Sequence, residues 1–180
     1  MFYKTLSIGG LDVCTPRFKD NPQGVMWVDV QGLQTSDTVN RNEAEARKAV
    51  AIATQYASQF TTATIGIVTP FKAQAERINT FIPAEIRDRT IVDTVHKFQG
   101  DEKDIMIYSL VVTSNSPESK IRWIDCKVPN LVNVAVTRAK RLLVIVGNRN
   151  YIRTHSRRDL SLGCLEAYVS TIEARDNTDA

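Results

Sequence analysis

The stretch TIVDTVHKFQGDEKDIMIYSL, from Thr90 to Leu110, decides the fold of this chain. It begins with a short apolar run, breaks into a polar loop from His96 to Asp104, and resumes as a nearly continuous apolar run to Val112. The second run is rich in β-branched residues, which is typical of a strand covered on both faces in a parallel sheet between helix layers. The polar loop therefore enters a buried strand from outside, and its residues either serve a ligand or only turn the chain.

Strand and helix patterns alternate on both sides of this stretch. Short β-rich runs predict strands at Met26–Val30, Ile65–Thr69, Thr90–Val95, Asp104–Val112 and Leu142–Val146. Apolar residues at helical spacing predict helices over residues 42–60, 70–82, 130–139 and 159–174, the first of them capped by Asn42. This alternation predicts a doubly wound, mainly parallel α/β sheet with right-handed crossovers.

The composition fits one globular domain. The chain has 180 residues, of which 43% are hydrophobic and 24% are charged. We expect a single domain over residues 1–180, with an irregular segment at 1–24 and a frayed tail at 175–180. The irregular start leads us to expect a chain cut from a larger protein. The net charge of +3 permits a nucleic-acid partner but does not argue for one.

The cysteines and the apolar runs exclude several classes of protein. Cys14, Cys126 and Cys164 are odd in number and far apart, so neither a disulfide framework nor a zinc site is indicated. Reduced cysteines and the absence of a signal-peptide pattern predict an intracellular, cytoplasmic protein, or a nuclear one in a eukaryote. No apolar run approaches the ~20 residues of a membrane span, so we expect no membrane partner.

Sheets of this kind bind ligands beyond the carboxyl ends of their strands. We expect three polar clusters at that edge. The first follows the predicted strand at Ile65–Thr69 and consists of Thr69, Pro70, Lys72 and Gln74. The second is the loop from His96 to Asp104, and the third lies on the predicted helix before Leu142, with Asn133, Thr137, Arg138, Lys140 and Arg141.

Among these residues, Arg138 is the strongest candidate for a functional role. It follows Val134 by one helical turn, near the edge of an apolar helix side. A guanidinium on a rigid helix suits a transferring phosphoryl group, because it is always charged and carries a fixed fork of donors. Alternatively, Arg138 and Arg141 only snorkel or pair with surface carboxylates.

The other polar residues each have a functional and a structural interpretation. Gly100 either approaches a ligand or only permits a turn. Glu102 either accepts hydrogen bonds from a ribose or is a solvated loop acid. Thr69 and Thr94 either donate to backbone phosphates or simply fill strand positions.

Three segments together resemble a known family. The segment TVHKFQGDEKD at residues 94–104 resembles motif V of superfamily 1 helicases of the nonsense-decay RNA helicase type, and LVNVAVTRAK at 131–140 resembles their motif VI. The segment VTPFKAQ at 68–74 is similar to motif IV, where the aromatic residue is more often Tyr. Asn42 and Glu45 resemble the Asn-x-x-Glu-Ala region of the preceding helix. The match covers most of residues 26–149.

This resemblance implies a fold and a set of roles. The implied fold is the second RecA-like motor lobe of the helicase, a lobe like that of P-loop NTPases but without its own phosphate loop. The implied cofactors are ATP and Mg²⁺, bound mainly by the first lobe. Arg138 would be the arginine finger, and the nucleotide would contact Gln99, Gly100 and Glu102. Single-stranded DNA or RNA would contact Thr69, Pro70, Gln74, Thr94 and His96.

The chain itself lacks the parts that hold the phosphates. No GxxxxGK[ST] phosphate loop occurs in it, and no strand ends in paired acids that would hold Mg²⁺. The implied partners are therefore the N-terminal RecA-like lobe and a single strand, and we expect the 180 residues alone not to hydrolyse ATP.

Two other functions stay open from the sequence. Asp93 with the triplet Asp101-Glu102-Lys103 superficially fits the metal site of a Mg²⁺-dependent nuclease. A non-enzymatic nucleic-acid-binding module is the other alternative, because the chain has no phosphate loop. The sequence does not distinguish DNA from RNA as the partner.

Overall fold

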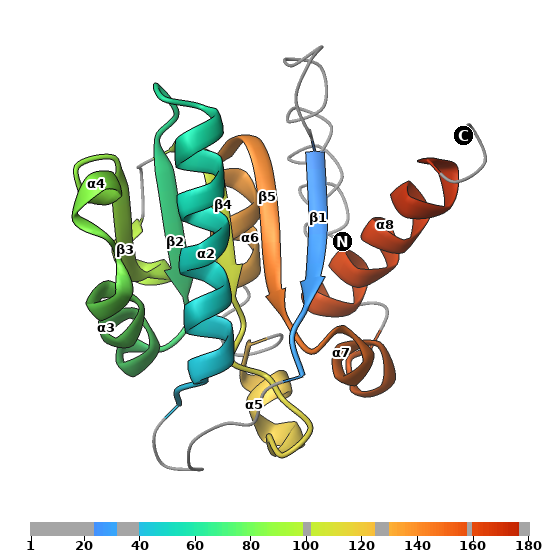
Figure 1. The fold of residues 1–180 in the computed structure, drawn as a ribbon. Coiled ribbons are helices and arrows are strands. Elements are labelled where there is room, and N and C mark those ends of the chain that lie inside the picture. Colours follow the sequence, from blue (N-terminus) through green and yellow to red (C-terminus); the bar gives the residue numbers. More distant parts are fainter. Residues whose placement is uncertain (1–23, 32–39, 99–101, 125–129, 158–159, 177–180) are drawn as a thin grey trace.

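The computed structural model describes residues 24–31, 40–98, 102–124, 130–157 and 160–176 (Figure 1). One sheet lies at its centre, built from β1 (Gly24–Asp29), β2 (Ile65–Thr69), β3 (Thr90–Thr94), β4 (Lys103–Ser109) and β5 (Ala139–Gly147). The order of the strands is β1-β5-β4-β2-β3, and every pair of neighbours is parallel. The prediction of a doubly wound parallel α/β fold of the RecA-like kind is confirmed. The predicted irregular segment at 1–24 falls outside the described residues up to residue 23, and the end of the predicted tail falls outside them from 177.

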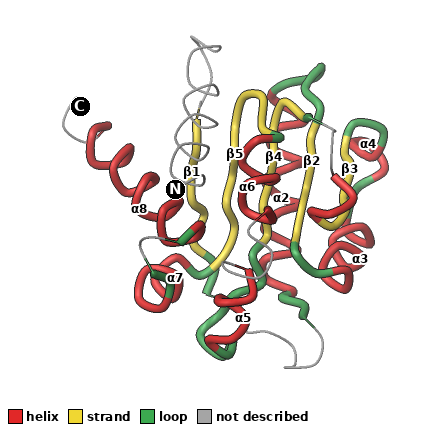
Figure 2. The backbone as a smooth tube through the Cα atoms, turned by 180° about the vertical axis from the view of Figure 1, so that it is seen from behind, coloured by secondary structure: helices red, strands yellow, loops and turns green. Residues whose placement is uncertain are grey.

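Helices cover both faces of the sheet (Figures 1 and 2). On one face lie α2 (Glu43–Gln59) and α3 (Lys72–Phe81), and on the other lie α6 (Asn130–Thr137) and α8 (Ser161–Asp176). The sequence did not predict the short elements, which are α4 (Ala84–Arg87), the 3₁₀ turn η1 (Val95–Phe98), α5 (Glu118–Arg122) and α7 (Arg149–His155). Each spans two turns or fewer, so its apolar residues show no helical period. No helix in the described part of the chain is long and apolar enough to cross a bilayer.

The central strands are apolar throughout because each face of the sheet has its own core. In β4, Ile105 and Ile107 pack into the core under α2 and α3, whereas Met106 and Tyr108 pack into the core under α6 and α8. All four side chains are at most 4% exposed. The nearly continuous apolar run from Ile105 to Val112 therefore reflects burial on both sides of the sheet.

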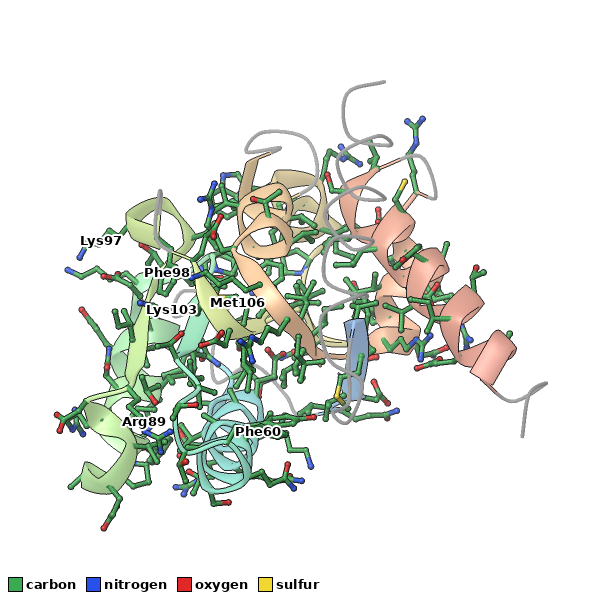
Figure 3. All side chains as sticks on the ribbon, turned by 90° about the horizontal axis from the view of Figure 1, so that it is seen from above. Phe60, Arg89, Lys97, Phe98, Lys103 and Met106 are labelled. Atoms are coloured by element: carbon green, nitrogen blue, oxygen red, sulfur yellow. The ribbon has the colours of Figure 1, made fainter. Side chains whose placement is uncertain are left out.

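Gly66 of β2 lets η1 fold back onto the sheet. A Cβ atom at this position would collide with the Sδ atom of Met106 and would lie 2.9 Å from Cζ of Phe98. Phe98 closes η1 and is 2% exposed, so it anchors the start of the polar loop in the core. Figure 3 shows Phe98, Lys103 and Met106 side by side at this place. Phe98, at the end of η1, is thus packed beside Lys103, where β4 begins.

Arg89 closes the carboxyl end of α2. Its guanidinium donates to the carbonyl oxygens of Ala57 at 3.0 Å, Phe60 at 3.0 Å and Thr61 at 2.8 Å. The last carbonyls of a helix have no partners within the helix, and a cation there also complements the helix dipole. Figure 3 labels Arg89 and Phe60, which come from segments far apart in the sequence.

We expect Arg89→Ala to lower the free energy of unfolding by about 1–3 kcal/mol, because several half-buried carbonyls lose their donor. Chemical denaturation followed by circular dichroism measures the change. Arg87→Ala is the matched control, since Arg87 donates to a single carbonyl, that of Ile82. Equal losses for the two variants would contradict this role of Arg89.

Candidate functional site

The polar residues predicted from the sequence divide between two opposite edges of the sheet. Thr69 and Thr94 are register partners at the carboxyl ends of β2 and β3. Arg138 and Glu102, in contrast, directly precede β5 and β4, so they lie at the amino edge. The prediction that all three clusters share the carboxyl edge is wrong. The reason is the path of the chain: η1 and α6 follow β3 and β4 in the sequence, and the next strands, β4 and β5, begin at the opposite edge of the sheet.

Arg138 sits where α6 runs into β5. Its backbone N–H donates to the carbonyl of Val134 at 3.1 Å, and its carbonyl accepts from the N–H of Lys103 at 3.0 Å. These bonds hold the backbone of Arg138 against the start of β4, next to Glu102. The Nε atom of Arg138 is buried and has no hydrogen-bond partner within the described residues. A half-buried cation with an unused donor is therefore held at this edge.

Arg141 lies nearby, but its guanidinium is already paired with Asp104. Its Nε is 3.0 Å from Oδ1 of Asp104, whose Oδ2 accepts from both the backbone N–H and the hydroxyl of Thr64, at 2.9 and 2.8 Å. Burial alone would raise the pKa of Asp104, but the two bonds from Thr64 and the charge of Arg141 outweigh it and hold the pKa below its ordinary value. The ion-pair interpretation that covered both arginines thus describes Arg141, whereas no ion pair of Arg138 is present among the described residues.

The other predicted nucleotide contacts are only partly described. Glu102 is exposed at the amino edge, beside the backbone of Arg138. Gln99 and Gly100 lie outside the described residues. Among the described residues, the predicted nucleotide contacts at the amino edge are therefore Glu102 and the neighbouring Arg138.

The predicted nucleic-acid contacts do not form one exposed polar surface. Thr69 and Gln74 are 0% exposed and Pro70 is buried, while Thr94 is half-buried. Gln74 donates to the carbonyl of Asn42 at 3.0 Å and to the hydroxyl of Ser109 at 3.1 Å, and its own oxygen accepts from the N–H of Asn42 at 2.8 Å. The predicted contacts therefore do not all face solvent, because Gln74 has its polar atoms satisfied inside the lobe. The side chain of His96 lies outside the described part.

A buried carboxylate, Glu45, organises the carboxyl edge, and the sequence analysis gave it no role there. It is 0% exposed, and it accepts from the hydroxyl of Ser109 and the N–H of Val111, both at 2.8 Å. The amide of Asn42 donates to its other oxygen at 3.1 Å. Burial raises the pKa of Glu45 to about 7, against these hydrogen bonds and the charge of Lys120. The Asn-x-x-Glu spacing at a helix start was the one signal in the sequence, since it is the pattern of a capping box.

The chain turns sharply after β4, and this turn leads to a groove at the carboxyl edge. Val111 has a φ of 55°, and its carbonyl accepts from Nζ of Lys120 at 3.3 Å. The groove has a volume of about 710 Å³ and is lined by Asn40, Phe71, Pro117, Ser119, Lys120, Arg122 and Trp123. The groove was not predicted from the sequence, because α5, which lines it, was not predicted either.

The proposed nuclease site is not assembled. Asp93 lies near the carboxyl end of β3, whereas Glu102 precedes β4 at the amino edge. The strand register places them about six residue steps apart along the sheet, which is roughly 20 Å. Among the described residues, no three His, Cys, Asp or Glu side chains are grouped so that they could hold a metal ion. The structure therefore contradicts the pairing of Asp93 with Glu102 on one metal.

Most of the chain is similar in sequence to known proteins. A family model described as "AAA domain" matches residues 10–150. The yeast "DNA polymerase alpha-associated DNA helicase A" from Saccharomyces cerevisiae is 31% identical over 138 residues, covering 69% of this chain and 19% of the yeast protein. The human "RNA helicase Mov10l1" is 31% identical over 136 residues, covering 72% of this chain and 11% of the human protein. The chain thus spans a fifth or less of the length of these two relatives.

A solved structure, the C-terminal domain of a possible DNA helicase from Lactobacillus plantarum, is similar with a TM-score of 0.45 and 15% identity. The similarity covers 79% of this chain and 84% of that domain.

Proposed function

Because this chain belongs to the AAA-domain family and is a C-terminal lobe of the superfamily 1 helicase type, we propose that it is the second motor lobe of an ATP-dependent helicase. In this proposal the nucleotide lies between the amino edge of this lobe and a first lobe that carries the phosphate loop. Single-stranded DNA or RNA runs across the carboxyl edge. Closing and opening of the two lobes moves the protein along the strand.

The observation that carries the proposal is the Nε donor of Arg138 at the amino edge, which has no hydrogen-bond partner among the described residues. A half-buried cation costs free energy unless it meets a negative partner. A γ-phosphate presented by a facing lobe supplies that partner, and its charge spreads over the oxygens during transfer. Arg138 is then an arginine finger, with Glu102 beside it as a contact to the ribose or to water around the metal.

The residues of this chain fit ATP and Mg²⁺ only if a first lobe supplies most of their contacts. The chain has no phosphate loop, and its described part groups no acids that could hold a metal. ATP supplies the phosphoryl group and Mg²⁺ neutralises its charge when they are bound. What this lobe offers is a fork of donors from Arg138 and an acceptor from Glu102, with Gln99 and Gly100 completing the nucleotide contact. Thr94 and His96 are the proposed contacts to the single strand.

We expect the 180-residue chain alone to show no steady ATP turnover, because it has no cradle for the β- and γ-phosphates. A longer protein that joins this lobe to a phosphate-loop lobe should hydrolyse ATP, and a single strand should stimulate it. A coupled phosphate-release assay on both samples measures this. Turnover by the chain alone that disappears in Arg138→Ala would overturn the proposal. Strand binding by the longer protein without any turnover would favour the non-enzymatic module instead.

A further inference from the structure

We propose that the groove beside α5 is a base-binding site in which an unpaired base of a single-stranded nucleic acid stacks on Trp123. This inference rests on the proposed function, because the strand is the partner of the carboxyl edge. It adds a specific contact from a segment that the helicase motifs do not include. It also assigns a role to α5, which lies beyond the arrowheads of the strands in Figure 1.

The walls of the groove are aromatic. Phe71 and Trp123 stack on one another, with 5.6 Å between their ring centroids and 23° between their planes. Both pack against the core under α6 and α8, yet both stay half-buried and line the groove. Stacked rings fixed on a core form a rigid platform, so a base that adds to the stack orders no mobile side chain. Every base offers a flat face, which makes such a platform tolerant of sequence.

The charge around the platform suits a polyanion. Nζ of Lys120 lies 5.3 Å from the ring centroid of Phe71, and Arg122 is exposed at the mouth of the groove. Lys72 is exposed one residue after Phe71. Phosphates flank every base of a single strand, so cations around an aromatic surface match its alternation of flat and charged groups. Lys120 is buried and already donates to the carbonyl of Val111, so the exposed Arg122 and Lys72 are the cations that flanking phosphates would meet.

The floor of the groove is held by the buried polar network. Lys120 donates to the carbonyl of Val111, whose N–H donates to Glu45, so the first turn after β4 is fixed from both sides. Phe71 directly precedes α3, whose Gln74 is bonded to Asn42 and Ser109. Both walls of the platform are therefore tied to one rigid cluster at the carboxyl edge.

A second aromatic cluster provides a contrast. The ring of Phe81 lies 4.3 Å from the guanidinium carbons of both Arg47 and Arg77, and Arg77 also pairs with Glu43 at 2.6 Å. Its ring is thus engaged by two cations, and it borders the other core, under α2 and α3. Phe81 is a matched control for a half-buried aromatic residue outside the groove.

The fluorescence of Trp123 tests the proposal on the full chain. The chain has two tryptophans, and Trp27 is buried with its indole N–H bonded to the carbonyl of Gly147 at 3.0 Å. In Trp27→Phe, emission reports on Trp123 alone. We expect oligo-dT or oligo-U at low salt to quench this emission, and an abasic oligonucleotide of equal length to quench it far less, because stacking needs the base.

Affinity measurements complete the test. We expect Trp123→Ala to weaken oligonucleotide binding about 5- to 100-fold, Trp123→Phe to retain most of the affinity, and Phe81→Ala to leave it unchanged. Thermal melts confirm that each variant is folded. Equal quenching by the abasic strand, no quenching at all, or unchanged affinity in Trp123→Ala would overturn the groove assignment. None of these results would contradict the proposed function. That function is tested separately, and it fails if the longer protein lacks strand-stimulated ATP turnover.

Discussion

Arg138→Ala should lower strand-stimulated ATP turnover of the two-lobe protein by about 10³–10⁵-fold, the range in which supplied arginine fingers act. An arginine finger stabilises the negative charge of the phosphoryl group mainly in the transition state. Its loss should therefore lower turnover far more than nucleotide affinity. The reason to expect this of Arg138 in particular is its buried Nε, which has no partner in the described part of the lobe.

Arg138→Lys should not rescue turnover, because an ammonium is a point charge without the planar fork of donors. The matched control is Arg141→Ala, which removes a neighbouring guanidinium that is already paired with Asp104. We expect that control to keep most of the turnover and to lose at most about 1 kcal/mol of stability, since the side chain of Arg141 is half exposed and Asp104 keeps its two bonds from Thr64. Steady-state kinetics at saturating single strand, with thermal melts of every variant, measure these effects. If Arg138→Lys stays active, or Arg138→Ala loses activity only because it unfolds, Arg138 is not a finger.

Glu45 should make the stability of the lobe depend on pH between about 4.5 and 7. Its folded pKa of about 7 lies above its ordinary value of 4.5, so the folded state holds the proton more tightly than the unfolded state does. The stabilisation from this proton is complete below pH 4.5 and is lost as the pH rises through 7. The size of the shift corresponds to about 3 kcal/mol.

Glu45→Gln isolates this contribution, because it keeps the shape and removes the titration. We expect the stability difference between wild type and Glu45→Gln to change by about 3 kcal/mol between pH 4.5 and pH 7.5, in favour of wild type at low pH. Denaturant titrations at several pH values measure it. Comparing the two proteins cancels Asp104, whose lowered pKa acts in the opposite direction at more acid pH. A difference that stays constant across this range would show that Glu45 does not titrate there.

Glu45→Ala should cost more than Glu45→Gln at every pH. It leaves the hydroxyl of Ser109, the N–H of Val111 and the amide of Asn42 without their acceptor, in a place that water does not reach. Each buried donor left unpaired costs about 1–3 kcal/mol.

The arrangement of the strands was predictable because it depends on local patterns. The apolar runs at Ile65–Thr69 and around Ile105 show burial on both faces, and the helical spacing between them requires crossovers that make the strands parallel. Asn42 was recognised as a helix cap for the same reason, since its partner Glu45 is three residues away. Each of these features is encoded within a few residues of sequence.

The tertiary structure alone decided which polar residues are available to a ligand. From the sequence, an ion pair with a surface carboxylate was equally possible for Arg138 and Arg141. In the structure, Asp104 on the neighbouring strand pairs with Arg141. Gln74 is buried because Asn42 and Ser109, both more than 30 residues away, satisfy its amide. The groove exists only because Trp123 of a short, unpredicted segment stacks on Phe71. Hydrophobic periodicity reports how much of a segment is buried, but the identity of a polar partner depends on which distant strands and helices meet, and no local pattern carries that information.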